Sequence, residues 1–215
     1  MAYAVKEIYY TLQGEGANTG RPAVFLRFAG CNLWTGLEKD RARGPGGCSR
    51  WCDTDFVGVD GPGGGKFPTA AELVAAVRRQ WPEHAPRATP LVVCTGGEPL
   101  LQLDAELLDA LHRAGFVVAV ETNGTVEPPA GPLWLTVSPK ANTQLRITRG
   151  DELKLVFPQP GAEPERFVDL DFKHFYLQPL DGPEVAANTR AALDYCLAHP
   201  QWRLSLQTHK LLRIP

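Results

Sequence analysis

Short apolar runs alternate along the chain with segments in which apolar residues recur every three or four positions. The first pattern is typical of buried strands and the second of amphipathic helices. We therefore predict strands at 22–30, 90–95, 116–122, 133–138, 152–157, 175–178 and 202–207, and helices at 69–80, 103–115 and 184–199. Because strands and helices alternate, this order predicts an α/β fold built on a mostly parallel sheet.

Two of the helices carry end signals in the sequence. Thr69 and Glu72 fit a capping box at the start of the first helix. Asp104 is expected to cap the second helix and Gly115 to end it. Three helices are too few for a complete eight-fold barrel, so we expect a partial, helix-poor β/α barrel. The glycine-rich stretch 58–65 is expected to be a flexible loop rather than a domain linker.

Polar clusters follow several of the predicted strands. In parallel α/β folds the C-terminal strand ends gather on one face and carry the chemistry. We therefore expect one site built from Cys31, Thr95-Gly96-Gly97-Glu98, Glu121-Thr122-Asn123, Ser138-Pro139-Lys140 and Gln178-Pro179-Leu180-Asp181.

Composition narrows the class of protein. A length of 215 residues favours one domain, 1–215, and a net charge of −2 gives no basic face for nucleic acid. The start, MAYAVKEIYY, does not resemble a signal peptide, and no run approaches the ~18 apolar residues that span a membrane. We expect a cytoplasmic protein with reduced thiols, so clustered cysteines indicate metal binding or catalysis before disulfides.

Cys31, Cys48 and Cys52 lie in one loop, 31–52. Structural zinc normally takes four Cys or His ligands, whereas a four-iron cluster on three thiolates leaves one iron open. The three cysteines are therefore compatible with an iron–sulfur cluster, with a zinc site, or with thiols that bind nothing. The long first gap, residues 32–47, costs roughly 1.5 kcal/mol more loop-closure entropy than a three-residue gap, which three thiolate bonds can offset. Cys94 and Cys196 are expected to be small buried hydrophobes.

Taken together, YTLQGEG, the loop ending CDTDF, CTGGEP, ETNG, SPK and QPLDG resemble the radical S-adenosylmethionine enzymes. Among these they are most similar to the 7-carboxy-7-deazaguanine synthases of queuosine biosynthesis, a pathway of tRNA modification. The resemblance extends from about residue 5 to Pro215. The usual spacing in the superfamily is C-x3-C-x2-C, and the final pair here, C-x3-C, is one residue longer.

The resemblance implies a [4Fe-4S] cluster on Cys31, Cys48 and Cys52 whose open iron binds S-adenosylmethionine. One electron from the cluster would release a 5′-deoxyadenosyl radical. That radical would abstract hydrogen from C6 of 6-carboxy-5,6,7,8-tetrahydropterin. Ring contraction with loss of ammonia, assisted by Mg²⁺, would then give 7-carboxy-7-deazaguanine, which makes the enzyme a carbon–nitrogen lyase. A flavodoxin- or ferredoxin-like electron donor and a homodimer are implied as well.

The resemblance also assigns substrate-binding residues. The segment Leu12-Gln13-Gly14-Glu15 would read the pterin edge, and Thr95 would face the substrate. Arg27 would bind the substrate carboxylate; since a charge inside an apolar strand is costly unless paired, a structural carboxylate is its alternative partner.

Three further positions match family residues near the substrate. Glu121 would contact the substrate or the cofactor ribose, unless it only caps its strand. His209 would contact the substrate. Pro215 would present its carboxylate to the pterin, unless the chain end is frayed.

The cofactor residues follow in the same way. Backbone groups of Gly97 and Glu98 would bind the amino group of S-adenosylmethionine, although two glycines after a strand also make a simple turn. Thr54 would ligate magnesium, although Asp-Thr-Asp also forms turns. The remaining cofactor contacts implied are Asp53, Ser138, Pro139, Lys140, Gln178, Pro179, Leu180 and Asp181.

Two other functions remain to be weighed. A radical enzyme that activates a glycyl-radical partner usually carries additional ferredoxin-type cysteines and should lack Arg27 and the LQGEG segment. A zinc-binding interaction module would be colourless and would not cleave S-adenosylmethionine.

Overall fold

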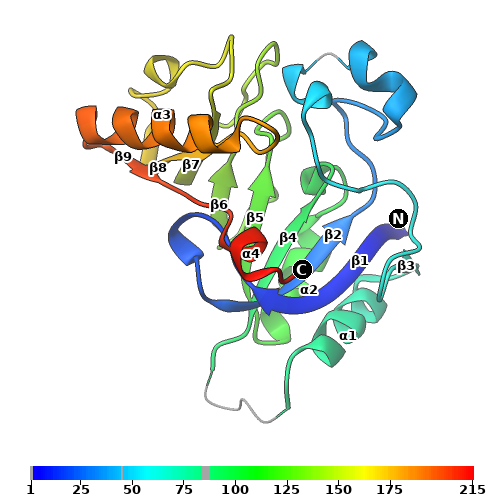
Figure 1. The fold of residues 1–215 in the computed structure, drawn as a ribbon. Coiled ribbons are helices and arrows are strands. Elements are labelled where there is room, and N and C mark those ends of the chain that lie inside the picture. The colour runs from blue at the N-terminus through cyan, green and yellow to red at the C-terminus, as the bar shows by residue number, and fades with distance from the viewer. Residues whose placement is uncertain (1, 45, 84–87) are drawn as a thin grey trace.

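One curved sheet organises the molecule (Figure 1). The computed structural model describes residues 2–44, 46–83 and 88–215, so Pro45 of the cysteine loop lies outside the described residues. Nine strands of the described part follow one another across the sheet in the order β3-β1-β2-β4-β5-β6-β7-β8-β9. From β2 to β9 every neighbouring pair is parallel, whereas β1 is antiparallel to both β2 and β3.

The strands are β1 Tyr3–Leu12, β2 Pro22–Phe28, β3 Gly65–Phe67, β4 Leu91–Gly96, β5 Val117–Thr122, β6 Trp134–Val137, β7 Arg149–Phe157, β8 Asp171–Pro179 and β9 Trp202–Leu204. The α-helices are α1 Ala70–Gln80, α2 Ala105–Arg113, α3 Val185–Ala198 and α4 Thr208–Leu212. Short 3₁₀ helices are η1 Gly16–Asn18, η2 Glu38–Arg43, η3 Gly47–Arg50, η4 Pro99–Leu101 and η5 Pro164–Arg166.

The predicted fold class is confirmed: the sheet is mostly parallel, open, and accompanied by few helices. Helices α1 and α2 pack together near β1, β2 and β5, and α3 packs on β8 and β9 (Figure 1). No helix among the described residues has the length and apolar character needed to cross a bilayer.

The predicted helix signals act as expected. The Thr69 hydroxyl accepts from the Glu72 amide at 3.2 Å, and Asp104 accepts from the Leu107 amide at 2.9 Å. Gly115 adopts φ +86°, the left-handed conformation that ends many helices. The apolar face of α1 is buried against the sheet.

Strand β1 was not predicted. Its polar Lys6 and Glu7 interrupt the apolar run, and a shift of register between Val5 and Glu7 breaks the two-residue alternation. The neighbouring glycine-rich loop is fastened to this strand, since Ile8 N donates to Pro62 O at 2.8 Å. Gly65, predicted as loop, begins the short β3.

The predicted last strand, 202–207, is too long. β9 ends at Leu204, and the following residues lead into α4, which was also not predicted. The polar side chains of Ser205 and Gln207 hydrogen-bond to Gly16 and Glu15, respectively. These contacts draw the chain out of the sheet and toward β1.

The core covers both faces of the central strands. Along β4, Val92 and Cys94 belong to the large core, whereas Leu91 and Val93 face a smaller one. Cys94 is fully buried, as predicted, whereas Cys196 is only partly buried and packs against the large core.

Candidate functional site

A cleft of about 390 Å³ opens where the parallel strands end. Each of the five predicted polar clusters contributes at least one residue to its wall. The predicted residues that line it are Leu12, Gln13, Gly14, Glu15, Arg27, Cys31, Cys48, Cys52, Asp53, Thr54, Thr95, Gly97, Glu121, Ser138, Lys140, Gln178, His209 and Pro215. The sequence pattern therefore located one contiguous site.

Five predicted residues do not line the cleft: Glu98, Pro139, Pro179, Leu180 and Asp181. Glu98 is fully buried, and its carboxylate accepts from Leu100 N, Thr122 Oγ1 and Asn123 N. Its backbone N donates to Gly30 O, and its carbonyl accepts from Leu101 N. Glu98 therefore ties the end of β4 to the end of β5.

Gly97 allows the cysteine loop to approach β4 closely. A Cβ at this position would lie 2.1 Å from Gly30 O and 2.8 Å from Cys31 Cβ. Its amide donates to Phe28 O at 3.4 Å. The glycine thus sets the distance between the loop that begins at Cys31 and the end of β4.

All five cysteines are free thiols, and three of them line the cleft. Cys31 Sγ accepts from Leu33 N at 3.4 Å. Burial raises the pKa of Cys31, and it raises that of Cys48 to about 11. No set of three or more His, Cys, Asp or Glu side chains in the described part of the chain gathers around a single ion position.

The extra residue between the last two cysteines is accommodated in a single helical turn. Cys52 N donates to Cys48 O at 2.8 Å, and Trp51 N donates to the same oxygen at 3.0 Å. The 3₁₀ helix η3 ends at Arg50, so Cys52 lies just beyond it. Cys48 and Cys52 both line the cleft, so the C-x3-C spacing still brings both residues to one site.

Arg27 projects into the cleft with structural partners. Its Nε donates to Glu7 Oε1 at 2.8 Å, and its Nη2 donates to Tyr9 Oη at 2.9 Å. The alternative partner expected for this buried charge, a structural carboxylate, is thus present. Arg27 pairs across the sheet with Thr95, so the two lie side by side in the wall.

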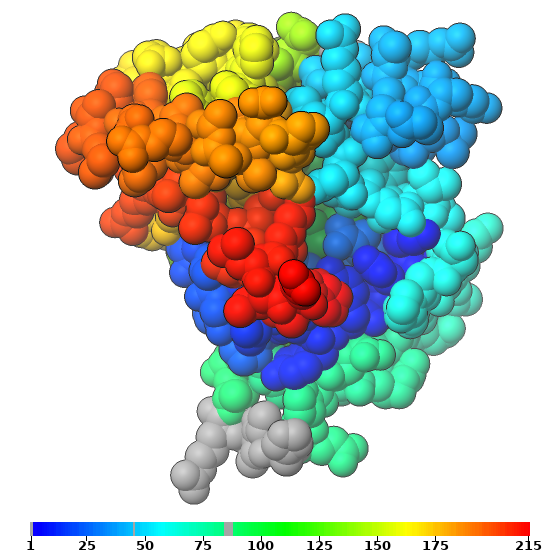
Figure 2. All heavy atoms as spheres, in the orientation of Figure 1, coloured from blue at the N-terminus to red at the C-terminus, as the bar shows by residue number. Residues whose placement is uncertain are grey.

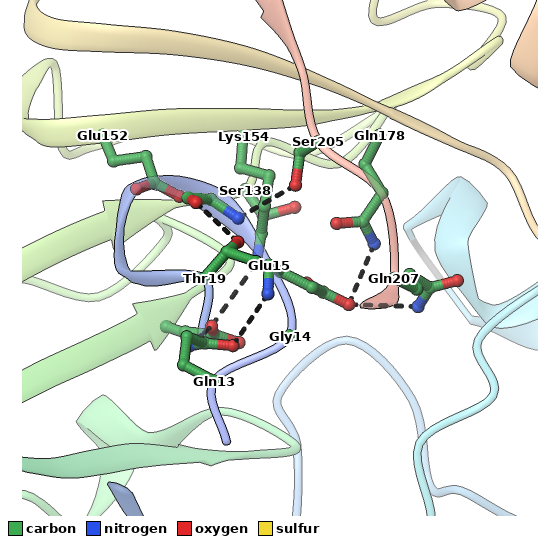
Figure 3. A network of polar contacts seen from close by, with 12 residues as sticks. Gln13, Gly14, Glu15, Thr19, Ser138, Glu152, Lys154, Gln178, Ser205 and Gln207 are labelled. Atoms are coloured by element: carbon green, nitrogen blue, oxygen red, sulfur yellow. Dashed lines mark hydrogen bonds and ion pairs between the residues drawn. The ribbon is translucent and has the colours of Figure 1, made fainter. Parts of the chain in front are cut away.

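A network of buried charges supports the segment 13–15 (Figure 3). Glu15 Oε2 accepts from Lys154 Nζ at 2.5 Å, and its Oε1 accepts from Gln178 Nε2 and Gln207 Nε2. Burial alone would raise the pKa of Glu15, but the Lys154 ammonium overcomes this and lowers it to about 2. Both carboxylate oxygens of Glu15 are therefore already engaged by side chains of the protein itself.

Lys154 joins two of the predicted residues. Its Nζ also lies 3.4 Å from Glu121 Oε1, which accepts from Gln13 Nε2 at 2.9 Å. Nearby, Glu152 accepts from Ala17 N at 2.9 Å, and burial raises its pKa. One ammonium thus pairs with two carboxylates of this wall, those of Glu15 and Glu121.

The C-terminal residues close another side of the cleft. Thr208 donates to Gly14 O through both its amide and its hydroxyl, and Thr11 Oγ1 donates to Pro215 O at 3.0 Å. A Cβ on Gly14 would lie 2.4 Å from His209 Nδ1, so glycine permits this packing. Figure 2 shows the red C-terminal segment lying against the blue N-terminal strand.

Lys210 links two predicted cofactor residues from different segments. Its Nζ lies 2.6 Å from both Asp53 Oδ2 and Asp181 Oδ2. Asp181 itself lies outside the cleft wall, while Asp53 and Thr54 lie in it. Lys210 therefore joins the end of the cysteine loop to the segment after β8.

Lys140 and Gln178 also line the cleft. Lys140 Nζ donates to Ser138 Oγ at 2.5 Å and stands 5.5 Å from the Trp51 ring centroid. Burial lowers the pKa of Lys140. Gln178 Nε2 donates to Glu15, while its Oε1 is shielded from solvent and has no hydrogen-bond partner among the described residues.

Some lining residues were missed. Lys154 is a charge inside the apolar run ELKLVF, the same signal that identifies Arg27. Glu7 and Tyr9 lie on β1, which the pattern did not predict, and Trp51 lies between two identified cysteines.

No protein-family model matches the chain. It is 62% identical over 215 residues to the 7-carboxy-7-deazaguanine synthase of Bordetella pertussis, and the match covers all of both proteins. A protein of the same name from Escherichia coli is 32% identical over 248 residues, again over both full lengths. A structure described as the crystal structure of QueE from Escherichia coli is similar, with a TM-score of 0.67 and 29% identity over 96% of this chain and 94% of that one.

Proposed function

The chain belongs to the 7-carboxy-7-deazaguanine synthase family of radical S-adenosylmethionine enzymes, and we propose that its cleft carries out that family's reaction. The reaction converts 6-carboxy-5,6,7,8-tetrahydropterin to 7-carboxy-7-deazaguanine with release of ammonia. The observation that carries the proposal is the 62% sequence identity to one of these enzymes over the full length of both proteins. In the same chain, the three loop cysteines line the cleft at the strand ends.

The cysteines fit a [4Fe-4S] cluster held by Cys31, Cys48 and Cys52. They are free, they line one cleft, and a backbone hydrogen bond from Cys52 N to Cys48 O holds the last two close together. A cluster binds each thiolate to a different iron, so the thiolates need not surround one point. With S-adenosylmethionine bound, the cluster would supply the 5′-deoxyadenosyl radical.

The wall beside the cysteines fits S-adenosylmethionine. The Gly97 carbonyl would accept from its amino group, and Gln178 is a further polar residue of this wall. Asp53, Ser138 and Lys140 supply further polar contacts. Glu98, Pro139, Pro179, Leu180 and Asp181 would then act by shaping the segments that carry these groups.

The opposite wall fits the pterin. Arg27, held by Glu7 and Tyr9, would orient the substrate carboxylate beside Thr95. Leu12, Gln13, Gly14 and the backbone of Glu15, with Glu121, His209 and Pro215, line the space where the ring would lie. Thr54 would provide a magnesium ligand, and water and substrate oxygens would complete its shell.

The partners and location proposed for the protein are those that its family implies. We propose that a flavodoxin- or ferredoxin-like protein delivers the electron, that the chain forms a homodimer, and that it acts in the cytoplasm, where its thiols stay reduced. Direct nucleic-acid binding is not proposed, because the net charge is −2. Family membership argues against both the glycyl-radical activase and the zinc module.

Anaerobic reconstitution tests the proposal. The chain is supplied with iron and sulfide, then with reductant, S-adenosylmethionine and the carboxy-tetrahydropterin. We expect about four irons per chain and a deazaguanine product. Colourless zinc protein would reject the function, whereas cofactor cleavage without that product would reject only the substrate.

A further inference from the structure

Arg41 lies in the long first gap of the cysteine loop, on η2, where no role has yet been assigned. This segment is part of the light-blue lobe at the upper right of Figure 1. Its guanidinium Nη1 donates to Ser49 O at 2.9 Å and to Cys52 O at 3.0 Å. These two carbonyls belong to the turn that carries the second and third cysteines.

The carbonyls at the end of a helical turn have no partner within the turn. A cation placed there satisfies them and also interacts favourably with the turn's dipole. Arg41 does this from a distant position in the loop, and one guanidinium bridges both oxygens. Both bonds come from Nη1, while Nε of the same guanidinium donates to Glu38 Oε2 at 2.5 Å. A lysine ammonium has only one nitrogen and cannot hold all three oxygens in this way.

The contact is reciprocal. Ser49 Oγ donates to Arg41 O at 2.6 Å, so both the side chain and the backbone of Arg41 are tied to the turn. Ser49 is almost fully buried. Gly44 makes this packing possible, because a Cβ there would lie 2.7 Å from Ser49 Oγ.

Arg41 also reaches the other side of the loop. Its Cζ lies 5.0 Å from the centroid of the Trp34 ring, a cation–π distance. Trp34 follows Cys31 closely and packs edge-on against Phe56 at 5.6 Å. Arg41 therefore touches the segment after the first cysteine as well as the turn of the other two.

We infer that Arg41 is a positioning residue that holds the Cys48–Cys52 turn against the Cys31 segment, and so keeps the three thiols in the arrangement that binds the cluster. This inference rests on the proposed [4Fe-4S] site. This role would explain the long gap between Cys31 and Cys48, since only a long insertion can bring η2 back over the turn.

The test compares four variants with the parent chain after anaerobic reconstitution: Arg41→Gln, Arg41→Lys, Ser49→Ala and Arg43→Gln. Arg43 is the matched control, because it lies on the same η2 but its side chain is 83% exposed and its nearest carboxylate, Asp40, is 3.7 Å away. The readouts are iron and sulfide per chain, the rate of iron loss to a ferrous chelator, and the electron paramagnetic resonance spectrum of the reduced cluster with and without S-adenosylmethionine.

Losing charge-assisted hydrogen bonds should speed iron loss about tenfold in Arg41→Gln. Arg41→Lys, which keeps the charge but loses the separate Nε contact to Glu38, and Ser49→Ala should each show a rise of about threefold. Arg43→Gln should match the parent. The Arg41→Gln spectrum should also change, while its thermal unfolding before reconstitution stays close to the parent's, which separates positioning from general stability.

Iron loss at the parental rate and an unchanged spectrum in Arg41→Gln would overturn the inference. If that variant does not fold, Ser49→Ala decides, and a parental rate there would overturn it equally. A parent chain that assembles no cluster would instead reject the proposed function, and the inference with it.

Discussion

Arg27 and Glu7 form an ion pair across strands β1 and β2, with 2.8 Å between Nε and Oε1. Tyr9, two residues further along β1, accepts from Nη2 of the same guanidinium and stacks on Phe25. The guanidinium is thus fixed in orientation before any ligand arrives. Fixed orientation is what a two-pronged contact to a carboxylate requires.

Replacing Arg27 by Lys should therefore weaken pterin binding while keeping the charge. Losing a charge-assisted, oriented contact should raise KM for the carboxy-tetrahydropterin roughly 10- to 100-fold. Steady-state kinetics at saturating S-adenosylmethionine measures the change. Arg21→Lys, an exposed change on the loop before β2, is the control. An unchanged KM in Arg27→Lys would assign the arginine to structure alone.

Removing the buried cation of Lys154 should destabilise the fold. Lys154→Met leaves the carboxylates of Glu15 and Glu121 close together without their ammonium. Breaking a buried ion pair in this way costs about 3–5 kcal/mol of the free energy of unfolding, measured by urea titration.

A matched pair of variants checks this cause. Lys173→Met removes a lysine that is 71% exposed and paired with Asp151, so its cost should stay within about 1 kcal/mol. Adding Glu15→Gln to Lys154→Met should recover part of the loss. Equal losses of unfolding free energy in Lys154→Met and Lys173→Met would contradict the stabilising role of the buried network.

The same network predicts a pH dependence. The pKa of Glu15 falls from its ordinary 4.5 to about 2 on folding, so the unfolded chain takes up this proton first as the pH drops. The stabilisation is complete above about pH 4.5 and is lost as the pH falls toward 2. The unfolding free energies of parent and Glu15→Gln should differ most near pH 6 and converge only as the pH reaches about 2. A difference that does not change between these pH values would refute the assignment.

Gly97→Ala should impair both the cluster and cofactor binding. The new Cβ would meet Gly30 O and Cys31 Cβ, and a backbone oxygen cannot swing aside as a flexible side chain can. We expect the cysteine loop to shift, with lower iron content after reconstitution and weaker S-adenosylmethionine binding by calorimetry. Parental values for both would show that the approach of loop and strand is not critical.

Much of the site could be predicted from the sequence because it follows from periodicity. Residues such as Thr95, Gln178 and Cys31 come directly after apolar runs, and parallel strands bring their ends together. Glu98 shows the limit of this reasoning. It follows a strand like its neighbours, yet its side chain turns behind the cleft, which only the local backbone path decides.

The remaining features depend on contacts between distant residues. The register shift in β1 breaks its apolar alternation, so the sequence pattern predicted neither this strand nor its cleft residues Glu7 and Tyr9. Arg41 carries no local signal, since its partners Ser49 and Cys52 lie further along a loop of irregular structure. α4 has five residues, and its first residue, Thr208, hydrogen-bonds to Gly14 O, which lies far away in the sequence, just after β1. The spacing of apolar residues, at every second position in a strand or every third to fourth position in a helix, does not reveal contacts between residues far apart in the sequence.

The contacts of Thr11 with Pro215 and of Gly14 with Thr208 have a consequence for the order of folding. They join residues that are 204 and 194 positions apart in the sequence. Closing so long a loop costs more conformational entropy than pairing neighbouring strands, and such long-range contacts form slowly. We therefore expect this wall of the cleft to form late in folding, after the more local strand pairs of the parallel sheet.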